Sequence, residues 1–151
     1  GETLRVLSWN IDRGGRPAMT TKIVDTALLQ RPDVIVLSEY RKDKPEIKTQ
    51  LFSRGFVAHV PAGDYKTGNQ IAVFSKRDLG FRSMVTSSRG PLEGLTAGCE
   101  NDEIAILGVF LPEKGKNESS IHSFLEWIDS DPLELYRKPT LLTGDFNCGI
   151  Q

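Results

Sequence analysis

The chain has 151 residues, enough for one domain with its own hydrophobic core, and its 38% hydrophobic and 26% charged residues are typical of a globular protein. Nineteen basic and twenty acidic side chains leave a formal net charge of −1. This balance excludes the strong overall positive field that attracts nucleic acid or acidic membranes, but it does not exclude a local basic patch. The apolar runs have only the length of strands, so no transmembrane segment is predicted.

A strand, a helix and a second strand are predicted at the start of the chain. Residues 4–11 (LRVLSWNI) are rich in strand-forming side chains, and a loop with glycines and a proline follows. Apolar side chains then recur at helical spacing from a cap at Thr20 or Thr21 to a stop at Arg31-Pro32. Residues 34–40 (VIVLSEY) begin with four apolar residues in a row, as in a strand that is covered on both faces. This order predicts a crossover unit and an α/β protein.

The rest of the chain continues with strands and one long helix. Strands are predicted at 56–62 (FVAHVPA), 69–76 (NQIAVFSK), 92–98 (LEGLTAG), 103–112 (EIAILGVFLP) and 139–147 (PTLLTGDFN). A helix is predicted at 117–132, with Ile121, Phe124, Leu125 and Ile128 on its apolar face. The sequence shows neither repeats nor a linker, so residues 1–151 are predicted to form a single domain. Its two cysteines are far apart, which favours free thiols, as in a reducing compartment, over a disulfide.

Three of the predicted strands end in oxygen-bearing side chains. The first ends at Asn10 and Asp12, the second at Glu39, and the last at Asp145 and Asn147. In α/β sheets the carboxyl ends of strands border the crevice where ligands bind. Carboxylate and amide oxygens suit Mg²⁺ or Mn²⁺, whereas zinc is disfavoured because no histidines or cysteines occur at ligand spacing.

Each of these residues also has a simpler interpretation when it is taken alone. An asparagine after a strand is often a turn residue that bonds to its own backbone, and Asp-x-Asn after a glycine is often only a turn. A glutamate at a strand end is usually solvated. Asp12 is equally well explained as half of an exposed Asp12-Arg13 loop pair.

The order of the motifs favours the functional interpretation. LSWNID, VIVLSEY, GNQIAVFSK, ILGVFLP and LLTGDFN follow one another along nearly the whole chain. In this order they resemble the endonuclease/exonuclease/phosphatase superfamily, which is similar to deoxyribonuclease I and the abasic-site endonucleases. The resemblance implies an α/β fold in which one mixed sheet with flanking helices forms the first half of a four-layer α/β/β/α sandwich.

The resemblance also implies a role for each matching residue. Glu39 is expected to bind the metal directly, with Asn10 supporting the metal or contacting phosphate and Asp12 assisting the metal. Asp145 is expected to orient and deprotonate the attacking water. Asn147 is expected to donate a hydrogen bond to the phosphoryl group or to hold Asp145 in place. The implied cofactor is Mg²⁺, or Mn²⁺ in its place.

Two features depart from the family pattern. Family members commonly carry a tyrosine or histidine at the position of Phe110, and a Ser-Asp-His motif well after Asn147. The chain ends four residues after Asn147, and neither of its histidines, His59 and His122, is expected to substitute. His59 lies in a predicted strand and His122 on the solvated face of the predicted helix.

These observations lead to three expectations. The chain is expected to be a fragment of a metal-dependent phosphoester or phosphodiester hydrolase with a nuclease-like activity, and to be inactive alone. The alternatives are a non-catalytic binding or assembly module and a lipid or inositol phosphate hydrolase of the same superfamily. The expected partner is a phosphate-containing substrate such as nucleic acid, and an exposed sheet face is expected to drive self-association or to bind a covering partner.

Overall fold

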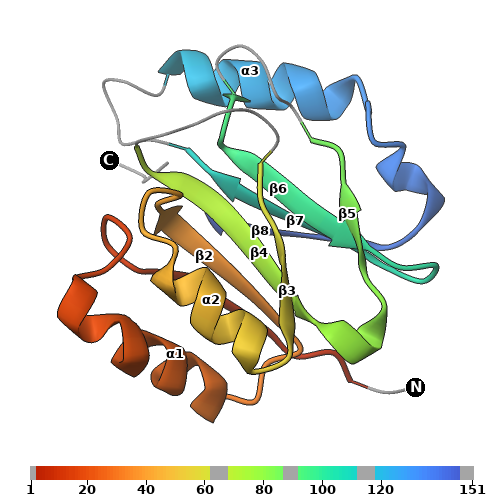
Figure 1. The fold of residues 1–151 in the computed structure, drawn as a ribbon. Helices are drawn as coiled ribbons and strands as arrows, with labels where there is room; N and C mark the ends of the chain where they lie inside the picture. The colour runs from red at the N-terminus through yellow and green to blue at the C-terminus, as the bar shows by residue number, and fades with distance from the viewer. Residues whose placement is uncertain (1–2, 62–67, 87–91, 112–117, 147–151) are drawn as a thin grey trace.

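A computed structural model describes residues 3–61, 68–86, 92–111 and 118–146, with only the backbone at 118–120. Two four-stranded sheets face each other, and helices cover the outer face of each sheet (Figure 1). These four layers confirm the predicted α/β class with mixed sheets and flanking helices. None of the helices in the described ranges is long and apolar enough to cross a bilayer.

The first sheet has the strand order β1-β2-β4-β3, with β1 parallel to β2 and the other neighbours antiparallel. Its strands and helices are β1 (Val6–Asn10), α1 (Thr20–Leu29), β2 (Val34–Tyr40), α2 (Glu46–Ser53), β3 (Phe56–His59) and β4 (Gln70–Lys76). The predicted threonine cap of α1 is wrong. The N-cap residue is Met19, because a 3-10 turn at Pro17–Met19 runs directly into the helix. Helix α2 was not predicted, since Ile47 and Leu51 are its only buried side chains.

The second sheet has the order β5-β6-β7-β8, with β7 parallel to β8 and the other neighbours antiparallel. Its elements are β5 (Arg82–Met84), β6 (Thr96–Glu100), β7 (Ala105–Phe110), α3 (Glu118–Asp129) and β8 (Thr140–Asp145). One detail of α3 differs from the prediction. Leu125 is 55% exposed, and Trp127 packs into the core instead because it lies three residues after Phe124 on the same side of the helix.

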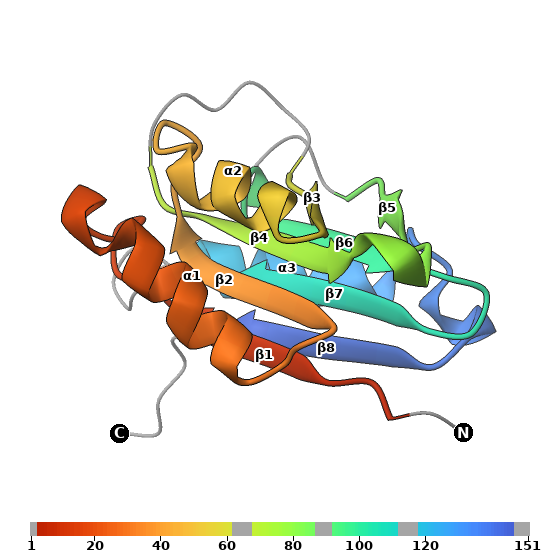
Figure 2. The same cartoon turned by 60° about the horizontal axis from the view of Figure 1, so that its bottom comes forward.

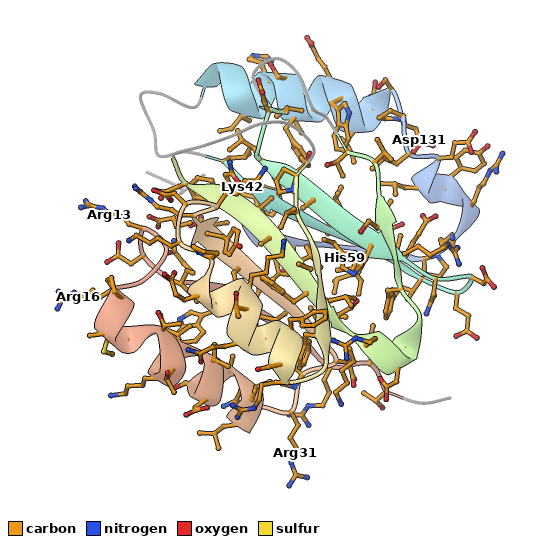
Figure 3. All side chains as sticks on the ribbon, in the orientation of Figure 1. Arg13, Arg16, Arg31, Lys42, His59 and Asp131 are labelled. Atoms are coloured by element: carbon orange, nitrogen blue, oxygen red, sulfur yellow. The ribbon has the colours of Figure 1, made fainter. Side chains whose placement is uncertain are left out.

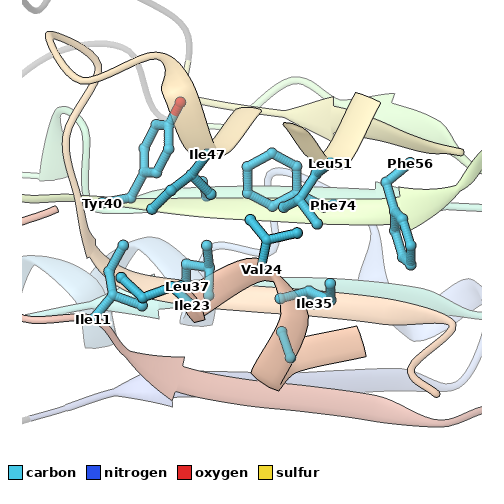
Figure 4. Packing of buried hydrophobic residues seen from close by; sticks show 12 residues of the cluster. Ile11, Ile23, Val24, Ile35, Leu37, Tyr40, Ile47, Leu51, Phe56 and Phe74 are labelled. Carbon is cyan, nitrogen blue, oxygen red and sulfur yellow. The ribbon is translucent and has the colours of Figure 1, made fainter. Parts of the chain in front are cut away.

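Three apolar clusters hold the layers together. The first joins α1 and α2 to the first sheet, where Val24 and Leu51 meet Ile35 and Phe74 (Figure 4). The second lies between the two sheets, and the third joins α3 to the second sheet around Phe124. Each sheet is therefore covered on both faces, which explains why its central strands are apolar at nearly every position.

The expectation of one sheet with a bare inner face is wrong. The inner side chains of the first sheet pack against the second sheet of the same chain, and Val34, Val36, Ile71 and Val73 are each 0% exposed. Gly108 on β7 permits this close packing, because a Cβ there would lie 3.0–3.1 Å from side-chain carbons of Val36, Ile71 and Val73. The inner face is therefore not exposed for the predicted self-association or covering partner.

Strands β1 and β8 are the edge strands on the same side of the two sheets and lie side by side (Figure 2). On β8, Leu141 and Leu142 are 38% and 40% exposed. The sandwich is therefore open along this side, and the carboxyl ends of β1 and β8 meet at one end of it.

Candidate active site

The loop after β1 is shaped by the side chain of Asn10. Its Oδ1 accepts a hydrogen bond from the Asp12 backbone N–H at 2.9 Å, which is the turn interaction expected of an asparagine at a strand end. Asp12 and Arg13 adopt left-handed backbone conformations with φ of 55° and 54°, and two left-handed glycines follow. Strained backbone of this kind clusters at functional sites because the surrounding contacts must hold it in place.

Glu39 lies at the end of β2, where a bulge between Ser38 and Tyr40 interrupts the ladder with β4. Glu39 is also left-handed, with φ of 57°, and its carbonyl oxygen accepts a hydrogen bond from Gly14. Its Oε1 accepts a hydrogen bond from Asn69 Nδ2 at 3.1 Å and a longer one from the Arg13 N–H at 3.4 Å. Its Oε2 has no hydrogen-bond partner within the described part of the chain, so this oxygen is available to a ligand.

Asp145 joins the second sheet to the first. Asn10 Nδ2 donates a hydrogen bond to Asp145 Oδ2 at 3.1 Å, although 135 residues separate the two in sequence. Gly144 makes this approach possible, because it has φ of 135° and a Cβ there would collide with the backbone of Val109 on β7. The glycine of the GDFN motif is thus required by the close pairing of β7 and β8, and it delivers Asp145 to the carboxyl end of β1.

The remaining predicted residues have different outcomes. The structure brings the Asp12 backbone to Asn10, but it records no hydrogen bond or ion pair of the Asp12 carboxylate in the described ranges. Asn147 lies outside the described residues. Phe110 is 6% exposed, contributes to the core between the sheets and pairs with Asp145 in the β7–β8 register, so it offers no polar group to this site.

Both histidines have surroundings that agree with their predicted structural roles. His59 is 4% exposed and bonds through both ring nitrogens to the hydroxyls of Ser75 and Ser83. Burial lowers its pKa from 6.5 to about 4, so the ring is neutral at physiological pH. His122 is exposed on α3. Neither ring has a recorded contact with Asn10, Glu39 or Asp145.

The donor atoms at this end of the sheets fit a divalent cation that prefers oxygen. Within the described ranges no cluster of three histidine, cysteine or acidic side chains could hold a metal. Mg²⁺ does not require such a cluster, because it is usually bound by one or two carboxylates together with waters and substrate phosphates. The available Oε2 of Glu39 and the nearby Asn10–Asp145 pair match that mode of binding.

Sequence analysis missed the residues that position Glu39. Asn69 lies just before β4, donates to Glu39 Oε1, and accepts a hydrogen bond from Arg41 Nε at 2.9 Å. Lys44 Nζ donates to the carbonyl oxygens of Arg13 and Gly15, at 2.9 and 3.2 Å. In the sequence, the only sign of Asn69 was its place at the start of the GNQIAVFSK motif, where an asparagine is usually an ordinary turn residue.

Solved structures of other proteins share the fold of this chain. The chain is similar in fold to a truncated form of TDP2 from Caenorhabditis elegans, with a TM-score of 0.69 and 16% identity over 97% of this chain and 63% of that one. It is also similar to the 3′ phosphatase NExo from Neisseria bound to a product DNA hairpin, with a TM-score of 0.69 and 17% identity over 96% and 58% of the two chains. A third similar structure is an AP endonuclease from Archaeoglobus fulgidus, with a TM-score of 0.66 and 16% identity over 99% and 59%.

At these identities the similarity establishes a shared fold, and this chain spans only 58–63% of the length of the three structures. No curated protein matches the chain in sequence. The sequence profile of the Endonuclease/Exonuclease/phosphatase family matches residues 7–149, which include all the motifs described above. The chain belongs to the endonuclease/exonuclease/phosphatase family.

Proposed function

We propose that this chain supplies the metal-binding and water-orienting part of a Mg²⁺- or Mn²⁺-dependent phosphodiester hydrolase that acts on nucleic acid. The observation that carries the proposal is the Asn10–Asp145 hydrogen bond, which brings the carboxyl ends of β1 and β8 together. Glu39 lies at the same end of the sheets, near the end of β2. Two of the similar structures are a 3′ phosphatase bound to DNA and an AP endonuclease, which supports a phosphate ester in nucleic acid as the substrate class.

Each residue has a distinct role in this proposal. Glu39 holds the cation through Oε2 while Asn69 keeps Oε1 in place. Asp145, oriented by Asn10, accepts a proton from the attacking water. Asn147 would donate a hydrogen bond to a phosphoryl oxygen, and Asp12 would assist in holding the cation. A bound cation of this kind neutralises negative charge on the phosphoryl oxygens.

The test is hydrolysis by the complete gene product that contains these residues. Single-stranded DNA, duplex DNA, RNA and a generic phosphodiester are each assayed with Mg²⁺ or Mn²⁺. We expect Glu39→Ala and Asp145→Asn each to lower turnover about 10²-fold or more, as loss of a metal ligand or general base does. Asp131→Asn is the control, at a half-buried turn after α3 that Figure 3 shows far from this end of the sheets. It should leave turnover unchanged, because asparagine keeps the Oδ1 that accepts a hydrogen bond from the Leu135 N–H. Undiminished turnover of Glu39→Ala would contradict the proposal.

A non-catalytic binding module is the second candidate, and the buried Phe110 favours it. A ring in the core between the sheets cannot bind phosphate at a position where the family commonly has a polar side chain. This candidate predicts that the complete gene product hydrolyses none of the four substrates. Turnover that is lost in Asp145→Asn would exclude it.

A further inference from the structure

An open groove lies at the end of the first sheet opposite the candidate active site. It has a volume of about 480 Å³ and lies where α2 and β4 end. The candidate active site is at the other end of β2 and β4, beside Glu39 and Asn69. A strand of seven residues is about 23 Å long, so the two places can bind different molecules at the same time. The residues that line the groove are Arg54, Gly55, Lys76, Arg77 and Asp78.

The groove lining carries an excess of positive charge, with three basic side chains and the single carboxylate of Asp78. Two of the cations already hold a carboxylate from outside the lining. Arg54 pairs with Asp25 at 3.2 Å, and Lys76 pairs with Asp33 at 3.4 Å. The side chains of these two cations are 48% and 41% exposed, and ion pairs at such a surface contribute little to stability. A carboxylate that enters the groove can therefore exchange with them at small cost.

Arg77 differs from the other two cations of the groove. Among the described residues no carboxylate pairs with it. Its Nη2 donates a hydrogen bond to the Phe52 carbonyl oxygen at 3.1 Å, and its backbone N–H donates to the Gly55 carbonyl oxygen at 2.8 Å. These bonds attach Arg77 to the end of α2 before any ligand binds, which reduces the entropy cost of binding. The guanidinium keeps further N–H donors for a carboxylate.

Phe52 adds an apolar surface to the border of the groove. The guanidinium of Arg77 lies over its ring, 4.6 Å from the ring centre, and the residue is still 61% exposed. A single exposed apolar side chain is ordinary in a globular protein. An aromatic ring with an arginine stacked on it, however, combines two residue types that are enriched at protein–protein interfaces. The border of the groove thus offers an apolar contact and a charged contact next to each other.

We propose that this groove is a docking site for an acidic peptide segment of a partner protein, with a carboxylate of the partner on Arg77 and an apolar side chain against Phe52. The charge of the groove favours a peptide over a polynucleotide. The carboxylates of Asp25, Asp33 and Asp78 lie among the cations and would repel a long chain of phosphates, whereas a peptide with a few carboxylates can place each one on a cation. The inference is independent of the proposed function, since it uses none of the residues of the candidate active site.

Fluorescence anisotropy with two labelled peptides tests the proposal. One is a short flexible peptide in which aspartates and glutamates flank leucines, and in the other asparagine and glutamine replace the acids. Each is titrated with the 151-residue chain at low and at moderate salt. We expect the acidic peptide to bind about tenfold more tightly at low salt and to lose this advantage as the salt concentration rises. Equal affinities for the two peptides at low salt would overturn the proposal.

The double variant Phe52→Ala/Arg77→Gln should bind the acidic peptide about tenfold more weakly, because it removes both contacts at the border of the groove. The matched control is Leu125→Ala/Arg137→Gln on the side of the second sheet. Leu125 is 55% exposed and the Arg137 side chain is 62% exposed, so this variant removes an equally exposed apolar side chain and arginine. The control should bind like the wild type. Equal affinities for the wild type and Phe52→Ala/Arg77→Gln would contradict the docking site.

A variant that gains affinity distinguishes a lost contact from a damaged fold. Asp78→Asn removes the single carboxylate of the lining and should bind the acidic peptide about threefold more tightly. An unchanged or lower affinity of Asp78→Asn would count against the proposal. A single-stranded oligonucleotide that binds more tightly than the acidic peptide, and that also loses affinity in Phe52→Ala/Arg77→Gln, would assign the groove to nucleic acid and overturn the proposal.

Discussion

Acidification should destabilise this protein through one buried histidine. His59 lies on β3 with Nε2 2.8 Å from the Ser75 hydroxyl on β4 and Nδ1 2.6 Å from the Ser83 hydroxyl on β5. A neutral ring can donate one of these hydrogen bonds and accept the other, whereas a protonated ring must donate both and carry a charge away from water. Burial lowers the pKa of His59 to about 4 in the folded protein, against an ordinary value of 6.5.

The sign and size of the effect follow from this difference in pKa. His59 takes up a proton near pH 6.5 in the unfolded chain but only near pH 4 in the folded protein. Between these pH values, protonation therefore favours the unfolded state as the pH falls. The contribution of neutral His59 is thus fully present above about pH 6.5, declines on acidification and is lost by about pH 4. The free energy of unfolding should fall by about 2 kcal/mol between about pH 8 and about pH 5, and by about 3 kcal/mol at about pH 4.

Urea unfolding of the wild type and of His59→Gln at about pH 8 and about pH 5 measures this effect. The glutamine amide can still donate and accept a hydrogen bond but does not titrate, so the variant should lose about 2 kcal/mol less between the two pH values. His122→Gln is the matched control, because His122 is exposed on α3 and should follow the wild type. Equal acid-induced losses in the wild type and His59→Gln would refute the reasoning.

Two further variants test the construction of the site. Gly144→Ala should lower the free energy of unfolding by about 3 kcal/mol or more, because its Cβ would collide with the backbone of Val109. Gly80→Ala is the control, because Gly80 has φ of 68° but nothing lies within 4 Å of an added Cβ. It should lower the free energy of unfolding by only about 1 kcal/mol. Thermal unfolding measures both variants, and an equal loss of stability at the two positions would contradict the collision. Asn69→Ala should weaken Mn²⁺ binding about tenfold, because it removes the hydrogen bond that holds Glu39 Oε1. A titration with Mn²⁺ measures this affinity. An unchanged affinity would show that Asn69 does not position Glu39.

The local elements of this fold were predictable because their signals lie within a few residues. Residues 34–40 read as a strand covered on both faces, and β2 occupies these residues with six of its seven side chains buried. The five motifs in order identified the family, and the family match over residues 7–149 confirms it. The same motifs placed Asn10 and Asp145 at strand ends, where the structure joins them by a hydrogen bond.

What the sequence by itself determined was therefore the type of most elements, the family and the chemical character of the site. Only the tertiary structure decided that the strands divide into two facing sheets, because strand pairing depends on contacts between distant residues rather than on local pattern. It also decided that Asn69 bonds to Glu39 and is itself bonded by Arg41, since these two polar residues acquire that role only when β2 and β4 lie side by side. The left-handed backbone at Arg13 also depends on tertiary contacts, because Glu39 on β2 and Lys44 on the following loop both bond to it.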